Sequence, residues 1–516
     1  MERRRAPAVP ERPRFGYRFL CLALVLSACG RSATPPAPGP THSPQPNIIL
    51  LLTDDQDLLM NSLDTMPRTR AWLTEQGASF SSFFVTQALC CPSRASILTG
   101  RYVHNHGVVT TTPPDGGFVK FHGAGLESQT IAVALERAGY RTALFGKYFN
   151  GYPRGEALTF VPQGWNEWEV PTSVIAAYSE LNYTLNVNGK LVPHAALPED
   201  YFTDVLSRAA ADFVTRQAAA AQPFFLYLAP VAPHRPFIPA ARHAEAFKGL
   251  RVPRTPSFNE EDVSDKPLFL QRPPLRPFEI RELDRIYRAR AQSMLAIDEM
   301  VEALFGALKS AGVLDNTFVF FASDNGVHLG QHRLDARKNT AYEEDVHVPL
   351  LVRGPGVPAG RVIPELAANI DLAPTFAELA GVALPGAIDG RSLVSLWSGR
   401  DAGAVSTPWR QAILLEHPDP PSRAAKAAAR AAQLRDSEEE GLPSPPFMGL
   451  RMATESYVEY GDGSCEDYDL AKDPQQLDNR CAHLAPPARK ERSAWLRVLA
   501  TCQGATCRTL ENRPPS

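Results

Sequence analysis

A strand and a charged turn meet in residues 47–57, which are Asn-Ile-Ile-Leu-Leu-Leu-Thr-Asp-Asp-Gln-Asp. The apolar run is continuous, as in a strand of a parallel sheet that is covered on both faces, and it lacks the alternation of a half-exposed strand. Asp54 and Asp55 follow at once, where the strand would reach the edge of its sheet. The segment therefore predicts a central strand of an α/β domain with two carboxylates at its carboxyl end.

Further apolar runs of the same character follow along the chain, at 141–145, 223–228, 317–322 and 348–352. Helical patterns separate them, notably at 130–138, 286–311 and 371–379. Strands that alternate with helices predict an α/β fold with a large, mostly parallel sheet sandwiched by helices. A chain of 516 residues is long enough to bury such a core.

Chemically capable side chains follow several of these runs at their carboxyl ends. Lys147 follows the run at 141–145, His234 follows the run at 223–228, and Asp324 with Asn325 follows the run at 317–322. Open α/β sheets bind their ligands at this edge, so we expect these residues to converge with the acidic pair of the first strand.

The composition of the chain changes after about residue 402. Short apolar segments predict a smaller antiparallel sheet, with strands at 411–415, 449–453 and 457–460 and a proline- and charge-rich insertion at 418–446. We therefore expect a catalytic domain over 46–405 and a C-terminal α+β subdomain over 406–516. The net charge of −3 gives no reason to expect nucleic acid as a partner.

The N-terminus has the features of an export signal. Five arginines stand in the first fourteen residues, and the apolar run at 19–28 is too short to span a bilayer. The run ends in Leu-Ser-Ala-Cys, which resembles a bacterial lipobox in which Cys29 carries the lipid anchor. We expect a signal peptide with lipobox over 1–29, a proline-rich linker over 30–45, and a cell-envelope lipoprotein that is periplasmic or on the outer surface. An ordinary secretory signal, and hence a secreted protein, is the alternative.

Four of the eight cysteines lie in the last tenth of the chain, namely Cys465, Cys481, Cys502 and Cys507. An even, late cluster in an exported protein predicts two disulfides. Sequence order favours Cys465–Cys481 and Cys502–Cys507, although other pairings stay open. A zinc site is the weaker alternative, because no two of these cysteines form a Cys-x-x-Cys pair.

The segment 90–100 is Cys-Cys-Pro-Ser-Arg-Ala-Ser-Ile-Leu-Thr-Gly. Its proline suits the first turn of a helix and its glycine the end of one. Cysteine nucleophiles are activated by a neighbouring base, yet no histidine stands within ten residues upstream. The pattern Cys-x-Pro-Ser-Arg followed by Leu-Thr-Gly resembles the signature of type I sulfatases, which belong to the alkaline phosphatase-like superfamily.

That resemblance implies a modified nucleophile and a reaction. A formylglycine-generating enzyme would oxidise Cys90 to Cα-formylglycine during maturation, and the hydrate of this aldehyde would attack the sulfur of a sulfate ester. Cys91 would be the variable position of the motif. The resemblance also implies the alkaline phosphatase-like version of the α/β fold.

Asp54, Asp55, Asp324 and Asn325 form an oxygen-only set of the kind that hard divalent cations require. Two adjacent carboxylates repel each other unless a cation or hydrogen bonds intervene. The family resemblance implies one Ca²⁺, or Mg²⁺ in some members, held by these ligand types and by the formylglycine oxygen at Cys90. Calcium is favoured, because carboxylates with a side-chain amide suit its loose coordination.

The resemblance also assigns the basic side chains. Arg94 would hold the surroundings of the nucleophile, and Lys147 and Lys338 match the two lysines that contact the sulfate. His234, in Ala-Pro-His-Arg-Pro, matches the histidine that protonates the leaving oxygen. Fixed cations are what an anionic substrate and a charge-spreading transition state require, and histidine is suited to donate a proton near neutral pH.

The chain departs from many arylsulfatases after Lys147. They continue Gly-Lys-Trp-His, with a histidine that helps to control the formylglycine hydrate, whereas residues 146–150 are Gly-Lys-Tyr-Phe-Asn. Phe149 takes the expected place of that histidine and cannot exchange a proton. The candidates to replace it are Asn150, His328, His332, His104 and His106.

The same departure indicates which sulfatases the chain resembles most. Cys-Cys-Pro-Ser-Arg, Tyr-Val-His-Asn-His at 102–106 and Gly-Lys-Tyr-Phe-Asn resemble N-acetylglucosamine-6-sulfatases and extracellular heparan 6-O-endosulfatases, and the resemblance runs from about 47 to 484. No basic cluster large enough for a long polyanion is visible in the sequence. We therefore expect exo-acting hydrolysis of a sulfated carbohydrate such as 6-O-sulfated N-acetylglucosamine, with aryl sulfates as further substrates.

Two other functions are alternatives. A phosphonate monoester or phosphodiester hydrolase of the same superfamily would share the fold, the aldehyde and the metal. A non-catalytic, sugar-binding surface lipoprotein would share the fold alone, and a host that failed to make the aldehyde would produce it.

Overall fold

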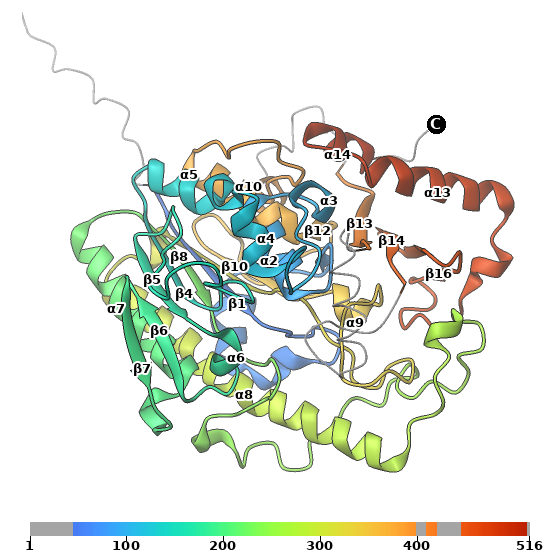
Figure 1. The fold of residues 1–516 in the computed structure, drawn as a ribbon, viewed down its shortest axis with the longest axis horizontal. Coiled ribbons are helices and arrows are strands. Elements are labelled where there is room, and N and C mark those ends of the chain that lie inside the picture. The colour runs from blue at the N-terminus through green and yellow to red at the C-terminus, as the bar shows by residue number, and fades with distance from the viewer. Residues whose placement is uncertain (1–44, 399–408, 420–444, 513–516) are drawn as a thin grey trace, which may run out of the picture. The chain divides into compact units, whose positions relative to one another are not determined.

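A ten-stranded sheet forms the centre of the structure, a computed structural model that describes residues 45–398, 409–419 and 445–512 (Figure 1). Its middle five strands run parallel, in the order β9 (Thr317–Ser323), β1 (Asn47–Thr53), β8 (Phe224–Ala229), β4 (Arg141–Gly146) and β5 (Glu167–Pro171). Every residue of β1 is buried, as its continuous apolar run predicts.

The outer strands make the sheet mixed. Beyond β9 lie β10 (Leu350–Arg353), β2 (Ala78–Phe80) and β11 (Arg361–Ile363), and beyond β5 lie β6 (Tyr183–Val187) and β7 (Lys190–His194). Strand β10 is antiparallel to β9 and β2, and β6 is antiparallel to β5 and β7. The run at 348–352 is therefore a strand, as predicted, but it runs against its neighbours. A separate short pair joins β3 (Phe83–Phe84) to β12 (Ala367–Ala368).

Helices cover both faces of the sheet, and β1 shows why. Ile49 and Leu51 pack into one core with α7 (Phe202–Ala220) and α8 (Pro277–Ser310). Ile48, Leu50 and Leu52 point the other way, into a core that includes α2 (Cys90–Thr99), α5 (Ile131–Arg137) and α10 (Leu372–Ala380). This alternation confirms the predicted sandwich.

Helix boundaries follow local signals. Helix α8 begins nine residues before the predicted segment, because Pro277 suits its first position and Glu279 accepts a hydrogen bond from the Arg276 N–H at 2.7 Å. Helix α2 ends at Gly100 with φ +69°, where an added Cβ would come within 3.0 Å of Ile388. Within the described residues, the other α-helices are α1 (Pro67–Thr69), α3 (Val103–His106), α4 (Gly117–Gly123), α6 (Val174–Ala177), α9 (Glu343–Val346), α11 (Val394–Ser398), α13 (Pro486–Leu499) and α14 (Ala505–Leu510).

The second sheet is small and antiparallel, with strands β13 (Ala412–His417), β14 (Phe447–Met452), β15 (Glu455–Tyr460) and β16 (Cys465–Asp469). The sequence predicts the first three and misses β16, whose residues are Cys-Glu-Asp-Tyr-Asp. Its Glu466 is buried and accepts hydrogen bonds from the hydroxyls of Tyr342 (2.8 Å) and Tyr460 (2.6 Å). A strand held by buried polar pairs shows no apolar run.

Two disulfides stabilise this C-terminal part, Cys465–Cys481 and Cys502–Cys507. They are the pairs that sequence order favours, and they leave no thiolate there for zinc. The lipobox with Cys29, the linker and most of the insertion at 418–446 lie outside the described residues. In the part of the chain that the structure describes, no helix has both the length and the apolar character to cross a membrane.

Candidate active site

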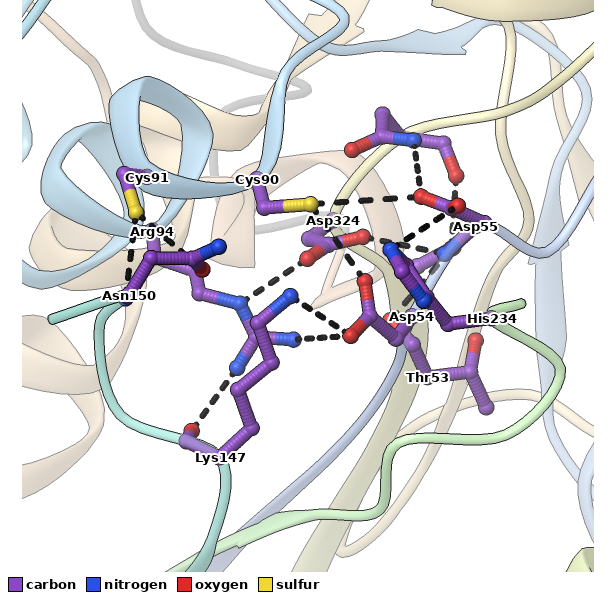
Figure 2. A network of polar contacts seen from close by, with 12 residues as sticks. Thr53, Asp54, Asp55, Cys90, Cys91, Arg94, Lys147, Asn150, His234 and Asp324 are labelled. Carbon is purple, nitrogen blue, oxygen red and sulfur yellow. Dashed lines mark hydrogen bonds and ion pairs between the residues drawn. The ribbon is translucent and has the colours of Figure 1, made fainter. Parts of the chain in front are cut away.

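Polar residues that follow four parallel strands meet at one edge of the large sheet (Figure 2). Lys147, after β4, donates to Asp54, after β1, at 2.6 Å. His234, after β8, places Nε2 at 3.7 Å from the Asp55 carboxylate. Asp324, after β9, accepts a hydrogen bond from the Asp55 N–H at 3.1 Å. The convergence expected from the strand pattern is therefore present in the structure.

The backbone turns sharply where β1 ends. Asp55 has φ +67°, in the left-handed region that few residues other than glycine adopt. Its N–H donates to Asp324, and its carbonyl accepts from Arg290 Nη2 at 2.5 Å. Strained residues that are held from several sides are concentrated at functional sites, and Asp55 fits this description.

Cys90 begins helix α2 and points its thiol into this acidic cluster (Figure 2). Its Sγ lies 3.5 Å from Asp54 Oδ1 and 4.0 Å from Asp55 Oδ1, and Lys338 Nζ donates to it at 2.8 Å. Burial raises the pKa of Cys90 well above its ordinary value, although Lys147 and Lys338 oppose this. The unmodified side chain is therefore a protonated thiol at neutral pH, which is a weak nucleophile.

Helix α2 directs the neighbouring thiol elsewhere. Cys91 is fully buried, and its Sγ accepts a hydrogen bond from the Asn150 N–H at 3.3 Å and lies 3.5 Å from Asn150 Oδ1 (Figure 2). Asn150, a candidate for the missing histidine, is thus engaged by Cys91. Only Cys90 of the adjacent pair faces the carboxylates.

Each of the three buried carboxylates at this edge has a buried cation beside it. The pairs are Lys147–Asp54 at 2.6 Å, Arg94–Asp324 at 2.8 Å and Lys338–Asp55. Burial opposes the charge of Lys147, but Asp54 raises the pKa of Lys147 well above its ordinary value. Burial and the charge of Asp54 raise the pKa of Asp324, despite Arg94. The three carboxylates therefore still repel one another, although each has a cation beside it.

The donor set suits a hard divalent cation. Ligand atoms of Asp54, Asp55, Cys90 and His234 all lie within 4.8 Å of one another. Asn325 Nδ2 donates to Asp55 at 2.7 Å, while its buried Oδ1 has no hydrogen-bond partner among the described residues. An orphaned amide oxygen beside carboxylates is what oxygen-seeking ions such as Ca²⁺ bind. The residues therefore fit the implied metal. Asp324, expected among the ligands, is engaged by Arg94 and the Asp55 N–H.

His234 is held in one orientation. Its Nδ1 lies 2.6 Å from the Arg235 carbonyl, which can only accept, so Nδ1 carries the proton and Nε2 faces the site. The ring stacks on Tyr178, with centroids 3.9 Å apart. Burial lowers the pKa of His234 to about 4, although Asp55 opposes this. The imidazole is therefore neutral at pH 7 in the absence of substrate.

The other candidate histidines belong to networks of their own. The pairs are His328–Asp345 (2.9 Å), His332–Glu260 (2.7 Å), His104–Glu416 (2.7 Å) and His106–Ser96 (3.1 Å). Among the described residues, no hydrogen bond or ion pair joins any of these four histidines to Cys90. Lys338 is the basic group that reaches its sulfur.

Two residues of this site have no signal in the sequence. Tyr178 stacks on His234, and its ring centroid lies 5.2 Å from Lys147 Nζ. Arg290, in the middle of α8, donates to the Asp55 carbonyl. Neither stands next to a strand end or within a motif, so only the folded chain reveals them.

Comparison with known proteins identifies the family. The family model described as Sulfatase matches residues 46–382. The chain belongs to the sulfatase family. The N-acetylglucosamine-6-sulfatase of Homo sapiens is 36% identical to this sulfatase over an aligned length of 483 residues, and the alignment covers 90% of this chain and 86% of the human protein. The enzyme is accordingly a sulfuric ester hydrolase.

Solved structures agree on the fold. One, of a protein in complex with its substrate D-glucosamine-2-N,6-O-disulfate, has a TM-score of 0.68 and 24% identity, and the match covers 88% of this chain and 97% of that one. The phosphonate monoester hydrolase of Agrobacterium radiobacter has a TM-score of 0.65 and 21% identity over 88% of this chain and 94% of that one. These matches confirm the predicted alkaline phosphatase-like architecture of the sulfatase.

Proposed function

We propose that this sulfatase removes the 6-O-sulfate from N-acetylglucosamine units, with Cys90 converted to formylglycine and a Ca²⁺ ion bound. One observation carries the chemistry: Cys90 Sγ points among Asp54, Asp55 and Lys338, whereas Cys91 faces Asn150. The substrate is supported by the similarity to the human N-acetylglucosamine-6-sulfatase and by the glucosamine disulfate bound to the structural neighbour.

The carboxylate edge would hold the ion. Asp54, Asp55, Asp324 and Asn325 would bind it together with the oxygen at position 90, and their mixed carboxylate and amide donors suit Ca²⁺ better than Mg²⁺. The formylglycine hydrate would supply a nucleophile with two oxygens, and the ion would stabilise negative charge on it and on the sulfate.

The buried cations would bind the substrate. Lys338 contacts Cys90 Sγ and Asp55, and Lys147 pairs with Asp54, which itself lies beside Cys90 Sγ. Both lysines would take the oxygens of the transferred sulfate. Arg94 donates Nε to Asp324 and Nη1 to the Lys147 carbonyl, both at 2.8 Å. Arg94 would therefore position one carboxylate and one lysine around the nucleophile.

His234 would protonate the leaving sugar oxygen. Its Nδ1–H is fixed by the Arg235 carbonyl, so Nε2 is the atom that can exchange a proton within the site. The pKa of His234 is low without substrate, and the negative charge of a bound sulfate ester would raise it. Substrate binding would thus help to charge the acid that the reaction needs.

The rival activity is a phosphonate or phosphodiester hydrolase. The test compares kcat/KM for an aryl sulfate, an aryl phosphonate with the same leaving group, and 6-O-sulfated N-acetylglucosamine, using calcium-loaded enzyme. We expect the sulfates to react faster than the phosphonate, and the sugar sulfate to release free sulfate. A higher kcat/KM for the phosphonate would assign the rival activity.

The two-oxygen nucleophile has its own test. Cys90→Ser should accept one sulfate and then stop, because a serine sulfate can be released only by attack at sulfur. A single burst of leaving group and a sulfated peptide at position 90 would be observed. Multiple turnovers at the wild-type rate would contradict the proposal.

We also propose that the enzyme is a lipid-anchored protein of a bacterial cell envelope, matured by a formylglycine-generating enzyme. The motif Leu-Ser-Ala-Cys before residue 30 supports the anchor. Cys29→Ala should move the protein from the membrane fraction to the soluble fraction. Membrane association that survives this change would refute the anchor, and the secretory alternative predicts no dependence on Cys29 at all.

A further inference from the structure

A cavity of about 670 Å³ lies between the loop at 271–276, the first turns of α8 and the loop at 333–337. Five arginines line it, namely Arg235, Arg272, Arg276, Arg333 and Arg337, against three carboxylates, Glu279, Glu282 and Asp335. Its volume is that of a site for a small organic ligand. We call it the arginine pocket.

Its positive charge is only partly neutralised within the protein. Arg276 pairs with Glu279 at 2.6 Å and Arg337 with Asp335 at 3.0 Å. Arg333 donates only to backbone carbonyls, including that of Arg272 at 2.9 Å. Carbonyl dipoles satisfy its hydrogen bonds and leave its full charge in the wall of the pocket.

Arg272 is the residue most available to a ligand. Its side chain is exposed, and within the described residues no hydrogen bond or ion pair engages its guanidinium. Beside it, Phe278 is 52% exposed, with the Arg276 guanidinium 4.3 Å from its ring centroid. An exposed aromatic ring in the same lining as Arg272 offers a surface for a sugar ring together with donors for its anionic substituent.

The pocket adjoins the proposed leaving-group side of the active site. Arg235 directly follows His234, and Arg337 directly precedes Lys338, so two walls of the pocket are one residue away from two groups of the site. A smaller cavity of about 380 Å³, lined in part by Tyr178, His234 and Arg235, shares Arg235 with the arginine pocket. The remainder of a substrate whose leaving oxygen meets His234 would extend in this direction.

We propose that the arginine pocket binds a second anionic group of the substrate, a carboxylate or a sulfate on the sugar unit joined to the sulfated aminosugar. This rests on the proposed function and extends it from a monosaccharide to an acidic oligosaccharide. The five arginines are spread over residues 235–337, so no basic cluster is visible in the sequence and only the fold assembles one.

The test uses four substrates that share a 6-O-sulfated N-acetylglucosamine. One is the monosaccharide, and the others carry it linked to galactose, to glucuronic acid or to sulfated galactose. We expect kcat/KM to be roughly tenfold higher for at least one of the two anionic disaccharides than for the galactose disaccharide. The two anionic arms distinguish a carboxylate site from a sulfate site.

Variants isolate the pocket from the chemistry. Arg272→Gln should reduce the preference for the anionic disaccharide roughly three- to tenfold and leave the monosaccharide unchanged, and Arg272→Lys should restore part of it. Arg281→Gln, an exposed arginine of α8 outside the pocket, is the matched control and should change neither. Equal rates on neutral and anionic disaccharides, or an equal loss on all substrates in Arg272→Gln, would overturn the proposal.

A binding measurement separates this inference from the proposed function. The unsulfated N-acetylglucosaminyl-glucuronic acid and N-acetylglucosaminyl-galactose can be titrated into the enzyme without any turnover. We expect tighter binding of the acidic disaccharide in the wild type and loss of that difference in Arg272→Gln. A binding difference in an enzyme that has no sulfatase activity would support the arginine pocket and refute the proposed function. Sulfatase activity without a binding difference would support the proposed function and refute the pocket.

Discussion

Two regions of the molecule bury charged side chains, and they differ in how completely the buried polar atoms find partners. At the catalytic edge, three carboxylates pair with three cations, and Asp54, Asp55 and Lys338 contact Cys90 Sγ. At a second region, which we call the C-terminal seam, Arg410 joins Asp371 (2.9 Å) to Glu511 (3.0 Å), and Arg391 adds a 2.6 Å contact to Glu511. Arg410, Asp371 and Glu511 are as fully buried as the charges at the catalytic edge.

The difference lies in what remains unsatisfied. At the seam, both oxygens of Asp371 and of Glu511 are engaged, with the Tyr102 hydroxyl completing Glu511, and only Arg391 Nε lacks a hydrogen-bond partner among the described seam residues. At the catalytic edge, Asn325 Oδ1 and Arg94 Nη2 have no hydrogen-bond partner among the described residues, and like charges are adjacent. Buried carboxylates whose oxygens are all engaged hold elements together, whereas an orphaned amide oxygen beside adjacent like charges marks a place for a ligand.

The largest expected effect is on catalysis and not on stability. Cys90→Ala should lower kcat by at least about a thousandfold, because the nucleophile is removed. Cys91→Ala is the matched control and should keep activity within a few fold, with a loss of stability of about 1 kcal/mol. Activities on an aryl sulfate and urea unfolding curves check both. Full activity of Cys90→Ala would contradict the comparison.

At the seam the expected effect is on stability. Asp371→Asn should reduce the free energy of unfolding by about 3 to 5 kcal/mol, because Arg410 keeps a buried charge with a weakened partner. The kcat of the folded protein should stay near that of the wild type. Asp64→Asn, which removes the exposed 3.7 Å pair with Arg70, is the control and should cost under about 1 kcal/mol. A comparable small loss in both variants would show that the seam is not structural.

Calcium binding should depend on the catalytic edge and not on the C-terminal seam. Calcium at a hundredfold excess over its Kd should stabilise the wild type by about 2.7 kcal/mol, seen as a higher Tm, and chelation should reverse this. Asp55→Asn should lose the response, whereas Asp371→Asn should keep it. An unchanged Tm of the wild type on adding calcium would contradict the inference that the orphaned Asn325 oxygen marks a calcium site.

The smallest expected effect is on the free energy of unfolding at acidic pH. Glu343, in α9, pairs with Arg451 of β14 at 2.6 Å and 3.0 Å, across to the smaller sheet. Burial alone would raise the pKa of Glu343, but Arg451 lowers it from 4.5 to about 2. The unfolded chain therefore binds the proton more readily, so this contribution is complete above pH 4.5 and is lost as the pH falls towards 2. The free energy of unfolding between pH 5 and 3 should fall less in Glu343→Gln than in the wild type. Equal slopes would contradict this.

Local pattern was enough to predict the strands that carry the catalytic edge. The run at 47–53 and its acidic end are visible because a doubly covered parallel strand must be apolar throughout. Strand β16 was missed because its buried Glu466 is satisfied by tyrosines from distant segments. Tyr178 and the arginine pocket were missed for the same reason, since their partners are far away in the sequence and only tertiary contacts define them.

The central claim is that Cys90, and not Cys91, becomes the nucleophile. Peptide mass spectrometry across residues 90–94, on enzyme purified in an active form, tests it most directly. We predict a mass that matches replacement of the Cys90 thiol by an aldehyde, with Cys91 still alkylated as a free thiol. Active enzyme with an unmodified Cys90, or with the aldehyde at Cys91, would contradict the account.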